Sequence, residues 1–491
     1  MDLTNASISE LSQAVRTKKI SALEVAKHFR GRIETLDKKL GSFISTNDSF
    51  EKEANAIDQK IAKGENPGLL AGVPFGIKDL LCTKGLKTTA ASKILENFIP
   101  PYDATVVSRL KNAGCVVLGK TNLDEFAMGS SNETSHYGIV RNPWNVECIP
   151  GGSSGGSAAA QSARLVVGTI GTDTGGSIRQ PASFCGVVGV KPTYGRVSRY
   201  GIIAYASSLD QAGPMVSTVE DAALVMEVIC GKDTMDSTTS SKPVPAFAKE
   251  INKNLKGYRV GLMKEYMTDN LYPDVKAAME KAVTDLKSQG VEIVEISVPL
   301  TAYAIPIYYL IASSEASSNL ARYDGVKYGY RADFASLSGI DLDQFYSKTR
   351  GQGFGKEVQR RIMIGTYCLS SGYFDAYYNK ACQVRRMMKD QFMEAFKKCD
   401  VILSPVTTAP AFKIGERISD PLAMYLNDIF TTSTNLAGLP GLSVPYSLSK
   451  DQGLPIGLQI TAAHFEEQKM LNVASVLEDM APAKGKKPNV I

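Results

Sequence analysis

Two glycine-rich turns in the first half of the chain constrain its fold more than any other feature. The first reads PGGSSGGS over 150–157, and the second reads DTGGS over 173–177. Glycine pairs allow the backbone to turn sharply and bring its N–H groups close to a ligand. Apolar runs at 165–171 and 186–190 follow these turns, which argues against a plain flexible linker. We therefore expect ordered turns that present serine hydroxyls and backbone donors.

Apolar runs separated by helical segments predict an α/β core, in which helices pack on a sheet. Runs at 258–262 and 292–296 flank a helix expected over 273–290, which is the pattern of a βαβ-like unit. Because such runs extend from about residue 70 to about residue 465, we expect one large domain. Further strands are expected at 73–81, 115–119, 401–405, 441–445 and 455–460, and further helices at 105–113 and 157–162.

Residues 1–66 are expected to form a helical segment that packs on this core. Ser21 and Glu24 match a capping box, in which each side chain bonds the backbone N–H of the other residue, and apolar residues follow at helical spacing. The stretch GENPG at 64–68 then breaks the helical pattern. Residues 67–491 are expected to form the main domain, with a mostly helical insertion at about 300–400.

The composition is that of a soluble globular protein, with 44% hydrophobic and 21% charged residues. A net charge of +5 permits contact with an RNA-bearing complex but does not require it. The apolar run at 302–312 is too short for a membrane span, and the first residues lack the pattern of a signal peptide. We expect a cytoplasmic protein without membrane contact.

The eight cysteines include no Cys-x-x-Cys pair, which argues against a zinc site and against a disulfide framework. Most of them lie in apolar stretches, so we expect buried free thiols. The sequence predicts no metal site.

Two catalytic interpretations of the first turn compete. Residues 151–155 match Gly-x-Ser-x-Gly, but no strand precedes them and only His464 follows as a histidine, so a hydrolase elbow is disfavoured. A phosphate loop is disfavoured because neither turn ends in Gly-Lys-Ser/Thr. The chain has only three histidines, so a histidine-based triad is disfavoured and a lysine becomes the candidate base.

Lys78 is that candidate, because it ends the apolar run Pro74–Lys78. A free lysine has a pKa of about 10.4, and burial can lower this value by several units. On a strand, Asp79 points to the opposite face and need not stabilise the charged amine. The alternative is a surface lysine, and only the serine turns favour the catalytic interpretation.

The chain resembles the amidase signature family over three long motifs. These motifs read GGSSGGSA from 151, GTDTGGSIR from 171 and GVKPTYG from 189. The resemblance implies a large mixed sheet covered by helices on both faces. It also implies a triad in which Ser177 is the nucleophile, Ser153, on a cis Gly152–Ser153 peptide bond, relays the proton, and Lys78 is the base.

The second turn would then form an oxyanion hole from its backbone. The N–H groups of Thr174, Gly175, Gly176 and Ser177 are expected to face the developing negative charge. Losing one such donor typically costs about 2.7–4 kcal/mol of barrier. Asp173 and Arg179 flank the turn, and we expect a buried pair that holds its shape, with a plain surface pair as the alternative.

Within the family, the resemblance is to the A subunits of tRNA-dependent amidotransferases, over nearly the whole chain. It implies that glutamine is bound by Tyr308, Arg361 and Asp428 and contacts Gly129 and Ser130. An arginine can clasp the α-carboxylate and an aspartate can pair with the α-ammonium. Arg360 and Tyr309 remain open as alternatives to their neighbours.

This resemblance implies a glutaminase that supplies ammonia to a partner. A B subunit would use the ammonia, with ATP and Mg²⁺, to amidate Glu-tRNA(Gln) and/or Asp-tRNA(Asn), and a C subunit would bridge the other two. The serine site itself would need no cofactor or metal. A stand-alone amidase of the same family and a catalytically idle scaffold are the alternatives.

Overall fold

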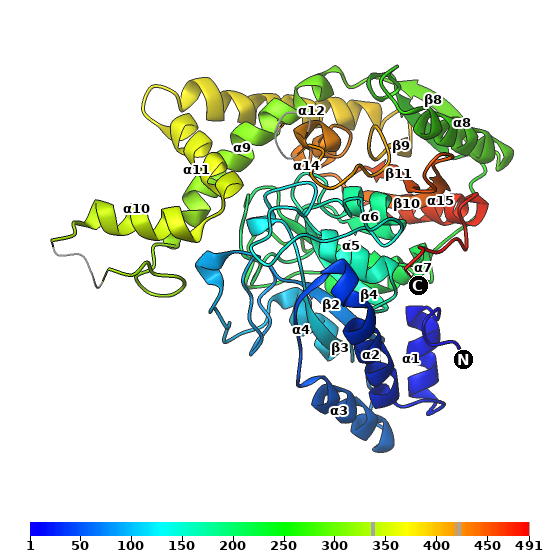
Figure 1. Ribbon diagram of the computed structural model, residues 1–491. Coiled ribbons are helices and arrows are strands. Elements are labelled where there is room, and N and C mark those ends of the chain that lie inside the picture. Colours follow the sequence, from blue (N-terminus) through cyan, green and yellow to red (C-terminus); the bar gives the residue numbers. More distant parts are fainter. Residues whose placement is uncertain (335–338, 418–419, 421–423, 491) are drawn as a thin grey trace.

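The computed structural model in Figure 1 describes residues 1–334, 339–417, 420 and 424–490. In this part of the chain an eleven-stranded mixed sheet has the order β1-β3-β2-β4-β6-β5-β10-β11-β9-β7-β8. The strands are β1 (Phe43–Thr46), β2 (Pro74–Lys78), β3 (Val116–Thr121), β4 (Gly168–Asp173), β5 (Val188–Lys191), β6 (Gln211–Val216), β7 (Arg259–Met263), β8 (Glu292–Ile296), β9 (Val401–Pro405), β10 (Gly441–Leu448) and β11 (Pro455–Ala462).

Helices precede, separate and follow these strands. The α-helices are α1 (Ile8–Arg16), α2 (Ala22–Leu40), α3 (Phe50–Ala62), α4 (Thr105–Asn112), α5 (Gly155–Ser162), α6 (Arg179–Cys185), α7 (Val219–Ile229), α8 (Pro273–Ser288), α9 (Ala304–Asn319), α10 (Leu342–Gly353), α11 (Lys356–Leu369), α12 (Lys380–Ala395), α14 (Thr432–Leu436) and α15 (Glu467–Met480). The short helical turns are η1 (Lys93–Leu95), η2 (Glu125–Ala127), η3 (Lys264–Tyr266), η4 (Pro299–Tyr303), η5 (Leu320–Arg322), η6 (Asp375–Asn379) and η7 (Leu426–Asp428).

The centre of the sheet is buried on both faces. Every residue of β2, β3, β4, β5, β6, β9 and β11 is buried, whereas β8 at one edge is partly exposed. Because successive side chains of a strand point to opposite faces, a wholly buried strand needs cover on both faces. The expected α/β fold with helices on both faces is therefore confirmed.

Parallel pairing at two places fixes the connections that matter for the site. β2 lies between β3 and β4 and is parallel to both. β7 and β8 are also parallel and are joined by α8, so the expected βαβ unit is confirmed. The C-terminal ends of β2 and β4 consequently lie next to each other, on the same side of the sheet along the strand direction.

The first 66 residues differ from the expected all-helical segment by one strand. The capping box of Ser21 and Glu24 is present at the start of α2. However, β1 pairs with β3 in antiparallel orientation and forms an edge of the sheet. β1 has only four residues of intermediate burial, so it lacks the apolar run that predicts the other strands apart from β6. The division at residue 66 stays a prediction.

Between β8 and β9 the chain forms the helices α9 to α12, in the region where the sequence predicts a helical insertion. Figure 1 shows α9, α10 and α11 extending to the left of the sheet, with α12 lying across the top. α9 packs along α11, and α14 packs on α9. This arrangement carries residues from α9 and α11 toward the turns that follow β4.

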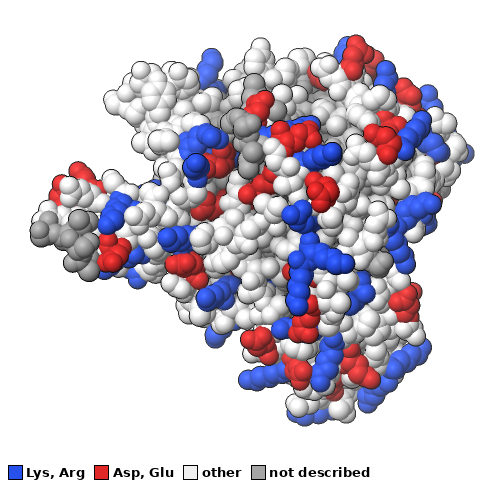
Figure 2. Space-filling model, viewed as in Figure 1, with Lys and Arg blue, Asp and Glu red and all other residues white. Residues whose placement is uncertain are grey.

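The surface shows no large area of one charge on the face in Figure 2, where basic and acidic side chains are interspersed. All eight cysteines are free, which confirms the expected thiols. Among the helices of the described ranges, none combines the length and the apolar character that crossing a bilayer requires.

Replacing Phe29 by alanine tests how strongly α2 is held on the core. Phe29 is fully buried on the inner side of α2. We expect Phe29→Ala to lower the free energy of unfolding by about 3–5 kcal/mol. Equilibrium urea denaturation measures this change, and Glu34→Ala on the exposed side should change it by less than about 0.5 kcal/mol. Equal effects of both substitutions would contradict the packing described.

Candidate active site

Lys78, the last residue of β2, places its amine among three hydroxyl groups. Its Nζ lies 2.8 Å from Ser153 Oγ, 2.8 Å from Ser154 Oγ and 2.8 Å from Thr172 Oγ1. The side chain is fully buried. Ser154 Oγ donates to the Thr172 carbonyl oxygen at 3.0 Å, so toward the amine it is an acceptor.

This arrangement suits a neutral amine, which has two N–H bonds and one lone pair. The hydroxyl oxygens of Ser154 and Thr172 can accept hydrogen bonds from the two N–H groups of the amine. The lone pair of the amine can then accept a hydrogen bond from the Ser153 hydroxyl. Burial lowers the pKa of Lys78 to about 7, although the charges of Asp124, Asp173 and Asp210 act in the opposite direction. Near neutral pH, the amine can therefore accept a proton.

Asp79 does not supply a counter-charge to Lys78. Its carboxylate points to the other side of the strand, where Lys120 Nζ lies 3.4 Å away and Thr89 donates both its N–H and its hydroxyl. The expected alternation is thus confirmed. As a result, the acid that neighbours Lys78 in the sequence does not stabilise its charged form.

The two glycine-rich turns meet at Ser154 and Ser177. The Ser154 N–H donates to the Ser177 carbonyl oxygen at 3.1 Å. The Gly152–Ser153 peptide bond is cis, as the resemblance implied. Ser153 is fully buried, whereas Ser177 retains 8% exposure, so of these two serines Ser177 is the one that a substrate can reach.

The backbone of the second turn differs at one position from the expected set of four donors. The Gly176 N–H donates to Asp173 Oδ1 at 2.9 Å, so it is directed into the turn. The N–H groups of Thr174, Gly175 and Ser177 meet no acceptor within the described residues. These three N–H groups are therefore available to a developing oxyanion.

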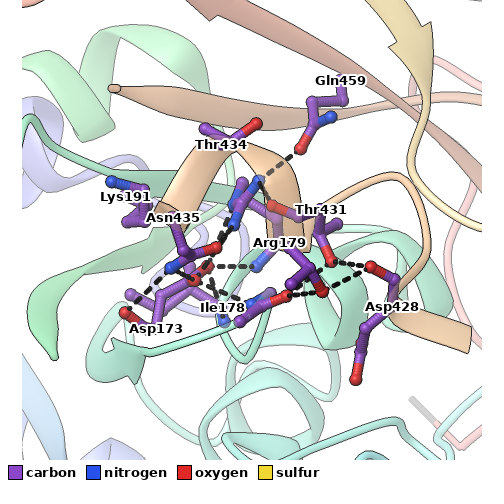
Figure 3. Close-up of polar contacts among 12 residues, drawn as sticks. Asp173, Ile178, Arg179, Lys191, Asp428, Thr431, Thr434, Asn435 and Gln459 are labelled. Carbon is purple, nitrogen blue, oxygen red and sulfur yellow. Dashed lines mark hydrogen bonds and ion pairs between the residues drawn. The ribbon is translucent and has the colours of Figure 1, made fainter. Parts of the chain in front are cut away.

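A buried ion pair holds this turn in place, as Figure 3 shows. Arg179 Nε donates to Asp173 Oδ2 at 3.0 Å, and both side chains are fully buried. Burial alone would raise the pKa of Asp173, but Arg179 lowers it to about 2. Arg179 also donates to the Thr431 carbonyl oxygen, to Asn435 Oδ1 and to Gln459 Oε1. The expected buried pair is confirmed, and it extends into a wider network.

Tyr308, on α9, contacts the second turn directly. A Cβ added to Gly175 would lie 2.7 Å from Tyr308 Cζ, so only glycine fits beneath this ring. Tyr309 instead stacks on Tyr425, with ring centroids 3.9 Å apart, and lies beside the guanidinium of Arg361. Both tyrosines thus border the site, but Tyr308 is the one against the turn.

Arg361, on α11, is buried beside the site, whereas Arg360 is half-exposed and pairs with Glu357. Arg361 Nε donates to Glu357 Oε1 at 2.8 Å, and Nη1 donates to Tyr205 Oη at 2.7 Å. Its Nη2 meets no acceptor among the residues that the structure describes. Arg361 therefore retains a donor for an anionic ligand.

Asp428, in η7, offers the complementary group. Its Oδ2 accepts from Ser130 Oγ at 2.5 Å, while its buried Oδ1 has no partner in the described part of the chain. A Cβ on Gly176 would lie 3.3 Å from that free oxygen, which places the carboxylate beside the second turn. Burial raises the pKa of Asp428 to about 7. An unpaired carboxylate oxygen here can receive a cationic group.

Gly129 lies where a side chain has no room, because its Cβ would fall 2.3 Å from Asp124 Cγ. Gly152 is restricted by the same carboxylate, at 2.1 Å from Asp124 Oδ2. Gln180 accepts from the Gly152 N–H and donates to the Ser130 carbonyl oxygen. The segment 129–130 is thus tied to the first turn.

Several site residues were not predicted from the sequence. Thr172 and Ser154 contact the amine, Tyr205 orients Arg361, and Asp124 and Gln180 support the first turn. Ser154 and Thr172 each lie within one of the family motifs, so the sequence carries a signal for both. Tyr205 and Asp124 carry no local signal. In the described ranges, no group of three or more His, Cys, Asp or Glu side chains could hold a metal ion.

Comparisons with known proteins show which family the chain resembles along its length. The family described as Amidase matches residues 24–471. The chain is 70% identical over 491 residues to the A subunit of glutamyl-tRNA(Gln) amidotransferase of Bdellovibrio bacteriovorus, and the match covers 100% of both sequences.

Solved structures are similar over the same length. The crystal structure of the A subunit of glutamyl-tRNA(Gln) amidotransferase from Thermotoga maritima has a TM-score of 0.81 and 41% identity, covering 100% of this chain and 99% of that one. The native peptide amidase from Stenotrophomonas maltophilia has a TM-score of 0.83 and 30% identity, with coverage of 100% and 99%.

Removing the cation of the buried pair should destabilise the protein strongly. Arg179→Met leaves the Asp173 carboxylate without its counter-charge, so we expect a loss of about 3–5 kcal/mol in the free energy of unfolding at pH 7. Urea denaturation measures the loss. Arg386→Met, which breaks the exposed pair with Asp390, should cost no more than about 1 kcal/mol. A loss below that value for Arg179→Met would show that the pair does not hold the turn.

Proposed function

Because this chain belongs to the amidase family and is similar along its whole length to the A subunit of glutamyl-tRNA(Gln) amidotransferase, we propose that it is a glutaminase subunit. It releases ammonia from glutamine for the amidation of aminoacyl-tRNA. The observation that carries this proposal is the buried amine of Lys78, 2.8 Å from Ser153 Oγ and next to the turn of Ser177.

The reaction begins when neutral Lys78 accepts the hydroxyl proton of Ser153, which in turn takes the proton of Ser177. Ser177 Oγ then attacks the side-chain amide carbon of glutamine. The N–H groups of Thr174, Gly175 and Ser177 stabilise the resulting oxyanion. When this intermediate collapses, the proton returns through Ser153 to the leaving nitrogen, and ammonia departs.

A water molecule completes the cycle. It attacks the glutamyl ester on Ser177, and the same lysine and serine remove its proton. Collapse of the second oxyanion restores the Ser177 hydroxyl and releases glutamate. No metal or cofactor takes part at this site, since the amine and the backbone N–H groups supply the base and the charge stabilisation.

Two charged groups account for the choice of glutamine over a simple amide. The free donor of Arg361 can bind the α-carboxylate, and the unpaired oxygen of Asp428 can bind the α-ammonium. Tyr308 forms part of the wall between them and the turn. A stand-alone amidase that acts on uncharged amides would have no use for an unpaired buried carboxylate.

The ammonia is used by a partner. The relatives are named as subunits, so we infer a complex in which a B subunit consumes the ammonia, with ATP and Mg²⁺, and a C subunit bridges this chain and the B subunit. The acceptor is Glu-tRNA(Gln), Asp-tRNA(Asn) or both, bound mainly by the B subunit. The complex acts in the cytoplasm.

Replacing the nucleophile separates this function from its rivals. In the complex with its partner subunits, Ser177→Ala should lower glutamine hydrolysis by about 1,000-fold or more. Ammonium chloride should still support amidation of the tRNA, because the partner is intact. Ser288→Ala, an exposed serine on α8, serves as the control.

Two other outcomes would each favour one of the alternative functions. Glutamine-dependent amidation by the Ser177→Ala complex, with ammonia absent, would favour an idle scaffold. Equal turnover of glutamine and of small uncharged amides, with or without the partner subunits, would favour a stand-alone amidase.

The pH dependence should report two groups that must both be deprotonated. Lys78 acts as a base only when neutral, and Asp428 binds an ammonium only when ionised, and the pKa of each lies at about 7. We therefore expect kcat/KM for glutamine to fall as pH drops below about 7, with a logarithmic slope between one and two. Stopped ammonia assays between pH 5.5 and 9 measure it.

Measurements at saturating glutamine should separate the titration of Lys78 from that of Asp428. Bound glutamine keeps Asp428 ionised, so kcat should fall below pH 7 with a slope of one, from Lys78 alone. Asp428→Asn should reduce the slope of kcat/KM to one as well. A profile that is flat between pH 6 and 8 would be incompatible with Lys78 as the base.

A further inference from the structure

Glu125, in η2, is a buried carboxylate that the proposed mechanism does not use. Its Oε2 accepts from the Gly355 N–H at 2.8 Å, and its Oε1 accepts from Ser92 Oγ. Only 4% of the residue is exposed. Gly355 is the residue immediately before α11, and Arg361 lies on that helix. Glu125 therefore holds the beginning of the helix that carries the arginine of the site.

On its other side, Glu125 is tied to the catalytic serine. The preceding residue, Asp124, donates its N–H to the Ser153 carbonyl oxygen at 3.2 Å. The Asp124 carboxylate accepts from the Asn132 N–H and fills the space beside Gly152. A single peptide unit thus separates the hydrogen bond to Ser153 from the side chain that binds α11.

The contact between η2 and the start of α11 is closely packed, so a shift of one of them would move the other. A Cβ on Gly355 would lie 2.3 Å from Glu125 Oε2, which leaves no room for movement toward the helix. The ring of Phe126 packs on Phe354, with centroids 5.6 Å apart. The Ser92 hydroxyl also lies 3.4 Å from the Gly353 carbonyl oxygen. The connection between α10 and α11 is therefore held at three successive residues, at Phe354 and Gly355 by η2 and at Gly353 by Ser92.

We propose that Glu125 is a positioning residue, which sets the distance between the serine turns and the arginine that receives the α-carboxylate of glutamine. This inference rests on the proposed function. Glu125 touches neither the substrate nor the reacting atoms. It acts through Arg361, so its removal should impair recognition of the carboxylate more than it impairs the chemistry of the amide.

The experiment compares two primary amides in the complex with its partner subunits. Glutamine has the α-carboxylate, whereas 4-aminobutanamide has the same amide and amine but lacks it. For Glu125→Ala, we expect kcat/KM for glutamine to fall by about 10- to 100-fold, mainly through KM, because a small misplacement of a binding group has effects of this size. For 4-aminobutanamide, we expect a change of less than about threefold.

Three further variants make the test specific. Glu125→Gln should retain most of the activity, because its amide oxygen can accept from Gly355 while its NH₂ donates to Ser92. Gly355→Ala pushes on the same contact from the helix and should reproduce the selective loss, even where Glu125→Ala does not fold. Glu478→Ala is the matched control, because Glu478 also accepts an N–H at the start of a helix, from Val219 of α7, and burial likewise raises its pKa to about 7.

A double variant tests whether Glu125 acts through the arginine. Once Arg361→Gln has removed the carboxylate contact, adding Glu125→Ala should lower kcat/KM for glutamine by no more than about threefold. Equal losses on both amides, or no loss on glutamine, would overturn the inference. If the unaltered complex does not hydrolyse glutamine, the proposed function fails instead, so the two failures can be distinguished.

Discussion

A lysine amine buried inside a β-sheet is the constraint on which the rest of this site depends. A carboxylate bonded to Lys78 would favour the charged form of its amine, and the structure surrounds this amine with hydroxyl groups instead. The three nearby carboxylates bond to other donors. Asp173 binds Arg179, Asp124 accepts from Asn132 and Thr134, and Asp210 accepts from Thr174 and two backbone N–H groups. Burial consequently dominates the pKa of the amine.

The site uses buried charge in two opposite ways. Asp173 and Arg179 form a closed network in which the carboxylate and guanidinium both find partners, so this network can hold the second turn rigidly. Asp428 and Arg361 each keep one polar group without a partner in the described residues. Such groups are costly in an empty site, and a ligand of opposite charge removes that cost. The pair of Asp173 and Arg179 thus keeps the turn rigid, whereas Asp428 and Arg361 can bind a ligand.

The sequence predicts those elements whose pattern lies within one short stretch of neighbouring residues. Glu292–Ile296 and Val401–Pro405 are strands with the expected bounds, because each is a short apolar run between clear boundaries. β6 was not predicted, since Gly213 and Pro214 interrupt its apolar pattern. Lys78 and the serines were indicated by motifs, whereas the free donor of Arg361 and the contact of Glu125 with Gly355 depend on pairing between distant segments. The diversion of the Gly176 N–H to Asp173 likewise depends on the exact path of the turn, which a motif does not specify.

The bond between Arg179 and Gln459 has a consequence for the order in which the protein matures. Gln459 belongs to β11, which the ribosome makes long after the turn that carries Ser177. Until β11 takes its place between β9 and β10, the guanidinium lacks one of its anchors and the second turn lacks its final support. A growing chain therefore holds Lys78, Ser153 and Ser177 from early on, yet the turn that carries Ser177 is complete only late in synthesis.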